Sequence, residues 1–197
     1  LKNKFINHAR NIFDRAVTLL PRIDQLWLKY SYMEEISGAI DQAMQVFERW
    51  MSWEPDEAAW IAYIKFYIRH NEVDRARLIY ERYITIHATP NAFLKYAKWE
   101  EKIGQIQFAR IIYEKALQVL GTSSSTTTTN NDNDNNNNTV TNMDLVLAFA
   151  RFEEKCEELD RARVIYKFAI DQQQLQQQQE QEEEGIGTGS GSKRKRL

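Results

Sequence analysis

The chain has 197 residues, of which 43% are hydrophobic and 12% are aromatic, enough to build a continuous apolar core. A formal net charge of −2 at pH 7 argues against a protein that attracts nucleic acid through the charge of the whole chain. The single cysteine, Cys156, excludes an internal disulfide and is typical of a reducing compartment, and no apolar run is long enough to cross a membrane.

The first predicted element is a helix around Ala9, and its pattern recurs along the chain. Apolar residues follow the alanine at three, four, seven and eight positions, which is the spacing of one face of an α-helix. The same pattern starts at four further alanines, with steps of 34, 33, 33 and 53 residues. These are Ala43, Ala76, Ala109 and Ala162. The regular step indicates a repeated packing unit, and the small alanine lets a neighbouring helix approach closely.

A second helical pattern precedes each of the last four alanine segments. A large apolar residue is followed by an aromatic residue three positions later and, in three of the four cases, by a glutamate seven positions later. These residues are Trp27, Tyr30 and Glu34, then Trp60 and Tyr63, then Phe93, Tyr96 and Glu100, and finally Val146, Phe149 and Glu153. Each repeat is therefore predicted to contain a first and a second helix that pack against each other.

Short hydrophilic turns separate the first helix from the second in each repeat. Gly38 and Gly104 are predicted to end first helices, because glycine adopts the left-handed backbone of a helix C-terminus at little cost. Asp74 and Asp160 are predicted to lie just before second helices and to cap their free amides.

The predicted fold class is all-α, a right-handed α-solenoid of antiparallel helix pairs that spans residues 1–171 in about four and a half repeats. The long step of 53 residues is one repeat plus a Thr/Asn-rich insert, predicted to be a disordered loop at 121–142. Residues 172–197 are predicted to be a low-complexity Gln/Glu and Gly/Ser tail that stays helical for a turn or two. The first segment has no first helix before it, so the chain resembles a portion of a longer array.

These two patterns together resemble the HAT (half-a-TPR) repeat, which pairs W-x-x-Y-x-x-x-E with A-R-x-I-Y-E-R. The second-helix signature is matched by Ala76 and Tyr80, by Ala109 and Tyr113, and by Ala162 and Tyr166. Tyr67 stands where the repeat prefers glutamate, and Met44 stands where it prefers arginine. Long stretches such as "QVFERWMSWEPDEAAW" and "FARFEEKCEELDRARVIYKFAID" resemble the crooked neck family of pre-mRNA splicing factors, over about residues 1–171 apart from the insert.

The resemblance implies a non-catalytic nuclear scaffold that bridges spliceosomal proteins. Its implied partners are other HAT-repeat and Myb-type components of the Prp19-associated (NineTeen) complex, with RNA contact indirect or weak and with no membrane and no small-molecule substrate. One alternative is another RNA-processing HAT scaffold, in mRNA 3′-end cleavage or rRNA maturation. A second is direct RNA binding, which predicts a basic stripe. The exposed second-helix positions alternate acid and base, as in Glu48–Arg49 and Glu81–Arg82, which argues against that stripe.

Paired glutamates recur at one repeat position, and we assign them to structure. Adjacent carboxylates on a helix point about 100° apart and cannot flank one substrate bond. Glu34, Glu100 and Glu153 are predicted to turn inward and bond an arginine or a backbone group of the adjoining helix. The signature aromatic residues are assigned to the core instead of to base stacking, and Trp50 and Trp53 are predicted to be buried beside the next repeat.

No catalytic, metal or cofactor residue is predicted, so no enzyme and no cofactor is expected. His8, His70 and His87 lie in three different repeats without ligand spacing, and Cys156 lacks a catalytic partner. A basic cluster close to the C-terminus is a candidate nuclear localisation signal. It consists of Lys193, Arg194, Lys195 and Arg196.

Overall fold

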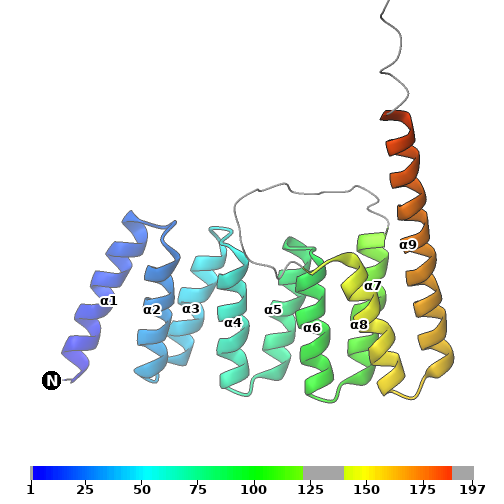
Figure 1. Cartoon of the computed structure of the whole chain (residues 1–197). Helices are drawn as coiled ribbons and strands as arrows, with labels where there is room; N and C mark the ends of the chain where they lie inside the picture. Colours follow the sequence, from blue (N-terminus) through cyan, green and yellow to red (C-terminus); the bar gives the residue numbers. More distant parts are fainter. Residues whose placement is uncertain (1, 122–139, 188–197) are drawn as a thin grey trace, which may run out of the picture. The chain divides into compact units, whose positions relative to one another are not determined.

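The computed structural model describes residues 2–121 and 140–187, and all regular structure in these residues is α-helical (Figure 1). The prediction of an all-α fold is confirmed. The chain divides into two compact units, Leu1–His87 and Ala88–Leu197. Each unit is built from antiparallel helix pairs of the predicted kind, in which a short turn joins a first helix to a second.

The first unit contains α1 (Lys2–Leu19), α2 (Asp24–Ile36), α3 (Ile40–Met51), α4 (Glu57–Arg69) and α5 (Val73–Ile86). Helices α2 and α3 form one pair, α4 and α5 form the next, and α1 packs on α2. Helix α4 contacts both helices of the preceding pair. This stacking buries the apolar face that a single helix pair would leave in water, as solenoid repeats require.

The second unit contains α6 (Pro90–Lys102), α7 (Ile106–Gly121), α8 (Asn142–Lys155) and α9 (Leu159–Gly187). Helices α6 and α7 form one pair, α8 and α9 form the other, and α8 contacts both helices of the first pair. The predicted loop at 121–142 falls between the two pairs. Its residues 122–139 lie outside the described part of the chain, whereas its two ends are the last residue of α7 and the first residue of α8.

Each turn within a helix pair uses one left-handed residue at the same repeat position. Gly38 and Gly104 adopt φ values of 80° and 79°, as predicted, and Asn71 and Glu157 adopt 56° and 63° without being glycine. The next residue closes each turn by donating its N–H to the carbonyl five residues earlier. This repeated hydrogen bond holds the left-handed backbone even where a side chain makes it costly.

The prediction that Asp74 and Asp160 cap second helices from outside is wrong. Helices α5 and α9 begin at Val73 and Leu159, so both aspartates lie inside the first turn. Each carboxylate instead accepts a hydrogen bond from an arginine three residues later, at 3.2 Å from Arg77 and at 2.8 Å from Arg163. Because the turn is closed by a hydrogen bond, each second helix begins earlier than predicted, before the aspartate. The negative charge of each aspartate is still stabilised by the positive end of the helix dipole.

Two first helices of the second unit have side-chain caps. Thr89 accepts a hydrogen bond from the backbone N–H of Ala92 at 3.2 Å, ahead of α6. Thr141 and Asp144 form a reciprocal capping box at the start of α8. These caps were not predicted from the sequence, although a threonine precedes each helix.

The last helix is longer than expected. Helix α9 continues through the Gln/Glu run to Gly187, more than the turn or two expected beyond Asp171. Glutamine and glutamate both favour helix, which explains the extension. Ile170 lies eight positions after Ala162, on the predicted apolar face, but it is 54% exposed because α9 is the last described helix and nothing described stacks on its far side. The candidate localisation signal at 193–196 lies outside the described residues.

Candidate functional site

The first-helix signature residues form the core of each unit. Each is at most 5% exposed, so these aromatic rings lie in the core and are not accessible for base stacking. They are Trp27, Tyr30, Trp60, Tyr63, Phe93, Tyr96 and Phe149. The rings also contact one another: Tyr63 stacks on Phe47 with centroids 4.6 Å apart, and Phe149 stacks on Tyr113 at 5.1 Å. Such pairs stabilise beyond the area they bury.

The second-helix signature residues are buried as well, with one exception at the end of the array. Ala76, Ala109, Ala162, Tyr80 and Tyr113 are all less than 9% exposed. Tyr166 is only half-buried, because α9 lacks a following helix among the described residues.

Arg10 and Glu34 join two successive repeats of the first unit. The Glu34 side chain is only 1% exposed, and its carboxylate accepts hydrogen bonds at 2.7 Å from both Nε and Nη2 of Arg10. The carboxylate in turn raises the pKa of the Arg10 guanidinium, chiefly through these hydrogen bonds. A two-pronged contact of this kind fixes orientation as well as distance. The prediction of an inward-facing glutamate bonded to an arginine is confirmed here.

The same relation recurs between Arg110 and Glu153 in the second unit. Glu153 is completely buried, and its two oxygens accept hydrogen bonds from Nε and Nη2 of Arg110 at 2.8 and 2.7 Å. A second cation, Arg161, brings its Nε to 3.3 Å from the same carboxylate. Glu100 is also completely buried, as predicted for the first glutamate of its pair.

The second glutamate of each pair has a different partner, which the sequence did not indicate. Glu101 accepts a hydrogen bond from the Tyr113 hydroxyl at 2.8 Å, and Glu154 accepts one from Tyr166 at 3.2 Å. In both cases the tyrosine lies 12 residues later, on the second helix of the same pair. Burial and the Glu101 carboxylate raise the pKa of the Tyr113 hydroxyl. These bonds hold the two helices of one repeat together.

Glu35 is the exception, because the residue 12 positions later is Phe47 and has no hydroxyl. Its carboxylate turns to α4, where it accepts bonds from Nε and Nη2 of Arg69 at 2.9 and 2.7 Å. The His70 ring nitrogen Nε2 lies 3.0 Å from the same carboxylate. Hydrogen bonding to Arg69 is the main reason that the pKa of Glu35 is lowered.

The two departures from the repeat signature occur at matching positions. Met44 takes the place of Arg10 and Arg110 on α3, and Tyr67 takes the place of Glu34 and Glu153 on α4. Both halves of the ion pair are therefore absent from this one junction. Tyr67 is buried, and its hydroxyl lies 3.1 Å from that of Tyr63. Leaving either partner alone would bury an unpaired charge, which is strongly destabilising.

Two aromatic side chains on second helices donate hydrogen bonds to acidic residues. In each case the acidic residue lies in the first turn of the first helix of the same repeat. Trp50 donates its Nε1–H to Asp24 at 3.0 Å, and the Tyr83 hydroxyl donates to Glu57 at 2.5 Å. Trp50 is 2% exposed, which confirms its predicted burial. Trp53 was predicted to be buried too, but it is 44% exposed because α3 ends at Met51 and leaves it in the turn.

On the outer surface of the first unit, acids and bases of successive second helices pair with each other. Arg49 Nη1 lies 2.7 Å from Asp14, and the Arg49 guanidinium lies 5.6 Å from the centroid of the Trp27 ring. Arg82 repeats both contacts, with Glu48 at 2.8 Å and with the Trp60 ring at 5.5 Å. Each exposed pair contributes little stability, yet together they neutralise this surface.

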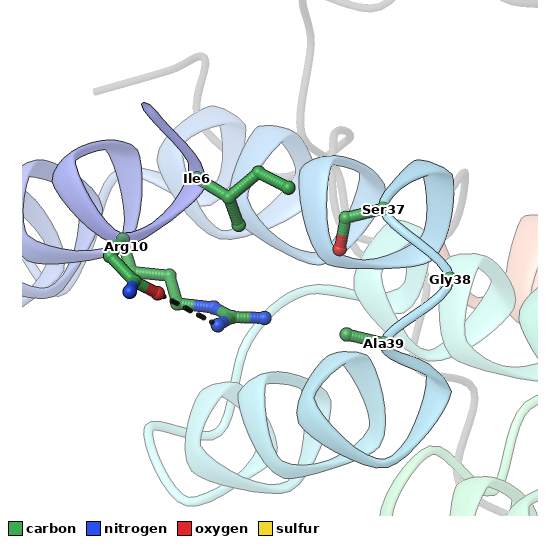
Figure 2. Close-up of a pocket in the computed structure, with 6 residues that line it drawn as sticks. Ile6, Arg10, Ser37, Gly38 and Ala39 are labelled. Atoms are coloured by element: carbon green, nitrogen blue, oxygen red, sulfur yellow. Dashed lines mark hydrogen bonds between the residues drawn. The ribbon is translucent and has the colours of Figure 1, made fainter. Parts of the chain in front are cut away.

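An open pocket lies between the start of α1 and the turn that joins α2 to α3 (Figure 2). Its lining residues are Ile6, Asn7, Arg10, Ser37, Gly38 and Ala39. The dashed line in Figure 2 is a hydrogen bond of 3.3 Å from Arg10 Nη1 to Asn7. Because Nε and Nη2 of Arg10 bond Glu34, its charge is already engaged, and the pocket brings together no nucleophile and base.

Cysteine and metal chemistry find little support in the described residues. Cys156 lies at the C-terminal end of α8, as expected of a helix-end residue, and burial raises the pKa of its thiol. Residues 2–121 and 140–187 contain no group of three histidine, cysteine or acidic residues that could hold a metal ion. Within the same ranges no helix combines the length and apolarity needed to span a bilayer.

The repeated helix pairs and the regular spacing of their contacts along the chain define a protein of the α-solenoid class, built from TPR-like repeats. Residues 1–128 match the family described as the pre-mRNA-splicing factor Syf1/CRNKL1 C-terminal HAT repeat. The chain therefore belongs to this family of HAT-repeat proteins. Among curated proteins, none matches the chain.

Several solved structures are similar to this chain at low sequence identity. MamA is 13% identical with a TM-score of 0.46, over 90% of this chain and 94% of that chain. The TPR-like repeats of a putative kinesin light chain from Podosopora anserina are 11% identical with a TM-score of 0.43, over 90% and 91% of the two chains. The APC/C hetero-tetramer Cut9–Hcn1 contains a chain that is 14% identical with a TM-score of 0.41, over 85% of this chain and 30% of that chain.

Proposed function

We propose that this protein is a non-catalytic scaffold in pre-mRNA splicing. It holds spliceosomal proteins together in the nucleus, as part of the Prp19-associated (NineTeen) complex, and its partners are other HAT-repeat and Myb-type components. The observation that carries this proposal is the family match over residues 1–128 to a splicing-factor HAT repeat. Extended stacks of helix pairs offer long surfaces suited to gripping protein segments.

The contacts of the recurrent carboxylates support a scaffold over an acid/base enzyme. Glu34 and Glu153 are buried against arginines, and a carboxylate held in this way is inaccessible to a substrate. Glu101 and Glu154 accept hydrogen bonds from tyrosines of their own helix pairs. The residues that recur most regularly in the chain therefore act in packing.

Direct RNA binding through the second helices is disfavoured by their charge. Asp14 pairs with Arg49, and Glu48 pairs with Arg82, so cations on this surface of the first unit are matched by acids. A phosphate backbone would meet as much repulsion as attraction there. The protein-bridging role is the better supported of the two.

The test is affinity purification of the full chain from nuclease-treated nuclear extract, followed by mass spectrometry. We expect recovery of spliceosomal proteins after RNA removal. A double variant, Trp27→Ala with Trp60→Ala, serves as the control because it removes two core side chains and should abolish specific capture. Recovery of 3′-end cleavage or rRNA maturation factors would instead support the alternative scaffold. Loss of all partners upon nuclease treatment would contradict protein bridging and support RNA contact.

A further inference from the structure

The two first helices of the second unit expose cations at matching positions. Lys98 and Lys102 lie on α6, and Arg151 and Lys155 lie on α8; all four are exposed. Residues four apart on a helix share one face, so each helix presents its two cations side by side, about 6 Å apart along the axis. We call these four residues the basic patch.

The repeat register places the two helices' cations next to each other. Lys98 and Arg151 occupy the same repeat position, five residues after Phe93 and Val146, and Lys102 and Lys155 occupy the position four residues further on. Helices α6 and α8 are in direct contact. Packed helices lie about 8–10 Å apart, so the basic patch is about one helical turn long and two helices wide.

The acids of the same two helices are bonded to groups outside the basic patch, although Glu154 is exposed and the charge of Arg151 helps to lower the pKa of Asp144. Glu153 is buried against Arg110, and Glu101 and Glu154 bond the hydroxyls of Tyr113 and Tyr166. Glu100 is completely buried, and Asp144 caps α8 through Thr141. By contrast, no residue of the basic patch forms an ion pair with any carboxylate in the described part of the chain. Folding thus leaves these four cations exposed and without ion pairs to the acids of their own helices.

The equivalent positions in the first unit lack this property. On α2 they hold Tyr32 and Ile36, which are exposed but uncharged. On α4 they hold Lys65 and Arg69, and the Arg69 guanidinium is already bonded to Glu35. The accumulation of unpaired cations is therefore a particular feature of α6 and α8.

We propose that the basic patch binds an acidic segment of a protein partner. The proposal deepens the scaffold function above and rests on it for the class of partner. Carboxylates one helical turn apart on a partner helix would match the spacing of the cations on α6 and α8. Unpaired surface cations attract such a segment with little desolvation, giving specificity and fast association more than high affinity.

A protein segment fits the basic patch better than RNA does. Proteins that hold single-stranded RNA combine cations with exposed aromatic rings on which bases stack. All five aromatic residues of α6 and α8 are at most 8% exposed. They are Phe93, Tyr96, Trp99, Phe149 and Phe152.

The test measures binding of the full chain to a fluorescein-labelled, alanine-based helical peptide with glutamates at every fourth position, by fluorescence anisotropy. The test variant is Lys98→Glu with Lys155→Glu. The matched control is Arg15→Glu with Lys167→Glu, which makes the same charge change at exposed second-helix positions. We expect affinity to fall about tenfold or more in the test variant and in 0.5 M salt, while the control binds as the wild type does.

Several results would overturn the proposal. These are no binding of the acidic peptide by the wild type, an equal loss in both double variants, or tighter binding of a single-stranded oligouridylate that the test variant abolishes. The last result would assign the basic patch to RNA. Failure of this proposal can be distinguished from failure of the proposed scaffold function. Loss of spliceosomal partners after nuclease treatment would leave the affinity for the acidic peptide unchanged.

Discussion

Glu153 is completely buried and forms an ion pair with Arg110 across 43 residues of sequence, with a distance of 2.7 Å between Nη2 and Oε2. Its neighbour Glu154 is exposed and accepts a hydrogen bond from Tyr166. Adjacent carboxylates of the same type thus have different roles, because one faces the preceding helix pair and the other faces the second helix of its own pair. This difference provides a matched pair of substitutions.

Replacing Glu153 with Gln should lower the free energy of unfolding by about 3 kcal/mol, since it removes the charge that compensates Arg110 in a buried site. Urea unfolding followed by far-ultraviolet circular dichroism would measure the loss. The control, Glu154→Gln, removes an exposed carboxylate and should cost less than about 1 kcal/mol. Equal losses in the two variants would show that the buried ion pair has no special role.

The junction between α3 and α4 should tolerate a buried Arg–Glu ion pair only when both residues are introduced together. Tyr67→Glu alone buries a carboxylate without its arginine and loses the hydroxyl contact with Tyr63, so the melting temperature should fall. Adding Met44→Arg should recover part of that loss. A double-mutant cycle should give a favourable coupling of about 1–3 kcal/mol. Additive effects would mean that positions 44 and 67 do not act as a pair.

Acid should weaken the link between α2 and α4. The bonds from Arg69 hold the pKa of Glu35 below its ordinary value, so the folded state favours the ionised carboxylate. The resulting stabilisation is complete above about pH 4.5 and is lost as the pH falls through the lowered pKa. At pH 6 the wild type should therefore have a higher melting temperature than Arg69→Gln. This difference in melting temperature should shrink below about pH 4. A constant gap between pH 3 and pH 7 would contradict this account.

Tyr83→Phe should destabilise the first unit by about 1–2 kcal/mol, because the buried Tyr83 hydroxyl donates to Glu57 and phenylalanine cannot. Guanidinium unfolding monitored by circular dichroism would measure the effect. Tyr32→Phe is the control, since the Tyr32 side chain is 60% exposed and its loss of a hydroxyl should be nearly neutral. A larger loss in the control than in Tyr83→Phe would rule out the proposed contribution of this bond.

The sequence by itself determined the helices, their pairing and the residues that face inward. Helical periodicity is a local property, so the spacing of Trp27, Tyr30 and Glu34 placed them on one buried face without knowledge of any neighbour. Likewise, Gly38 and Gly104 marked their turns because their left-handed backbone favours glycine.

The tertiary structure decided what each of those faces meets. Spacing along one helix could not tell that Glu101 would bond Tyr113 whereas Glu35 would bond Arg69, because that choice depends on which side chain the adjoining helix presents. The same reason explains Trp53. The local pattern predicted that this side chain is buried, but α3 ends before it and leaves it exposed. The same reason also explains the basic patch: the sequences of α6 and α8 mix acids and bases, and only packing determines which charges turn inward and which remain in water.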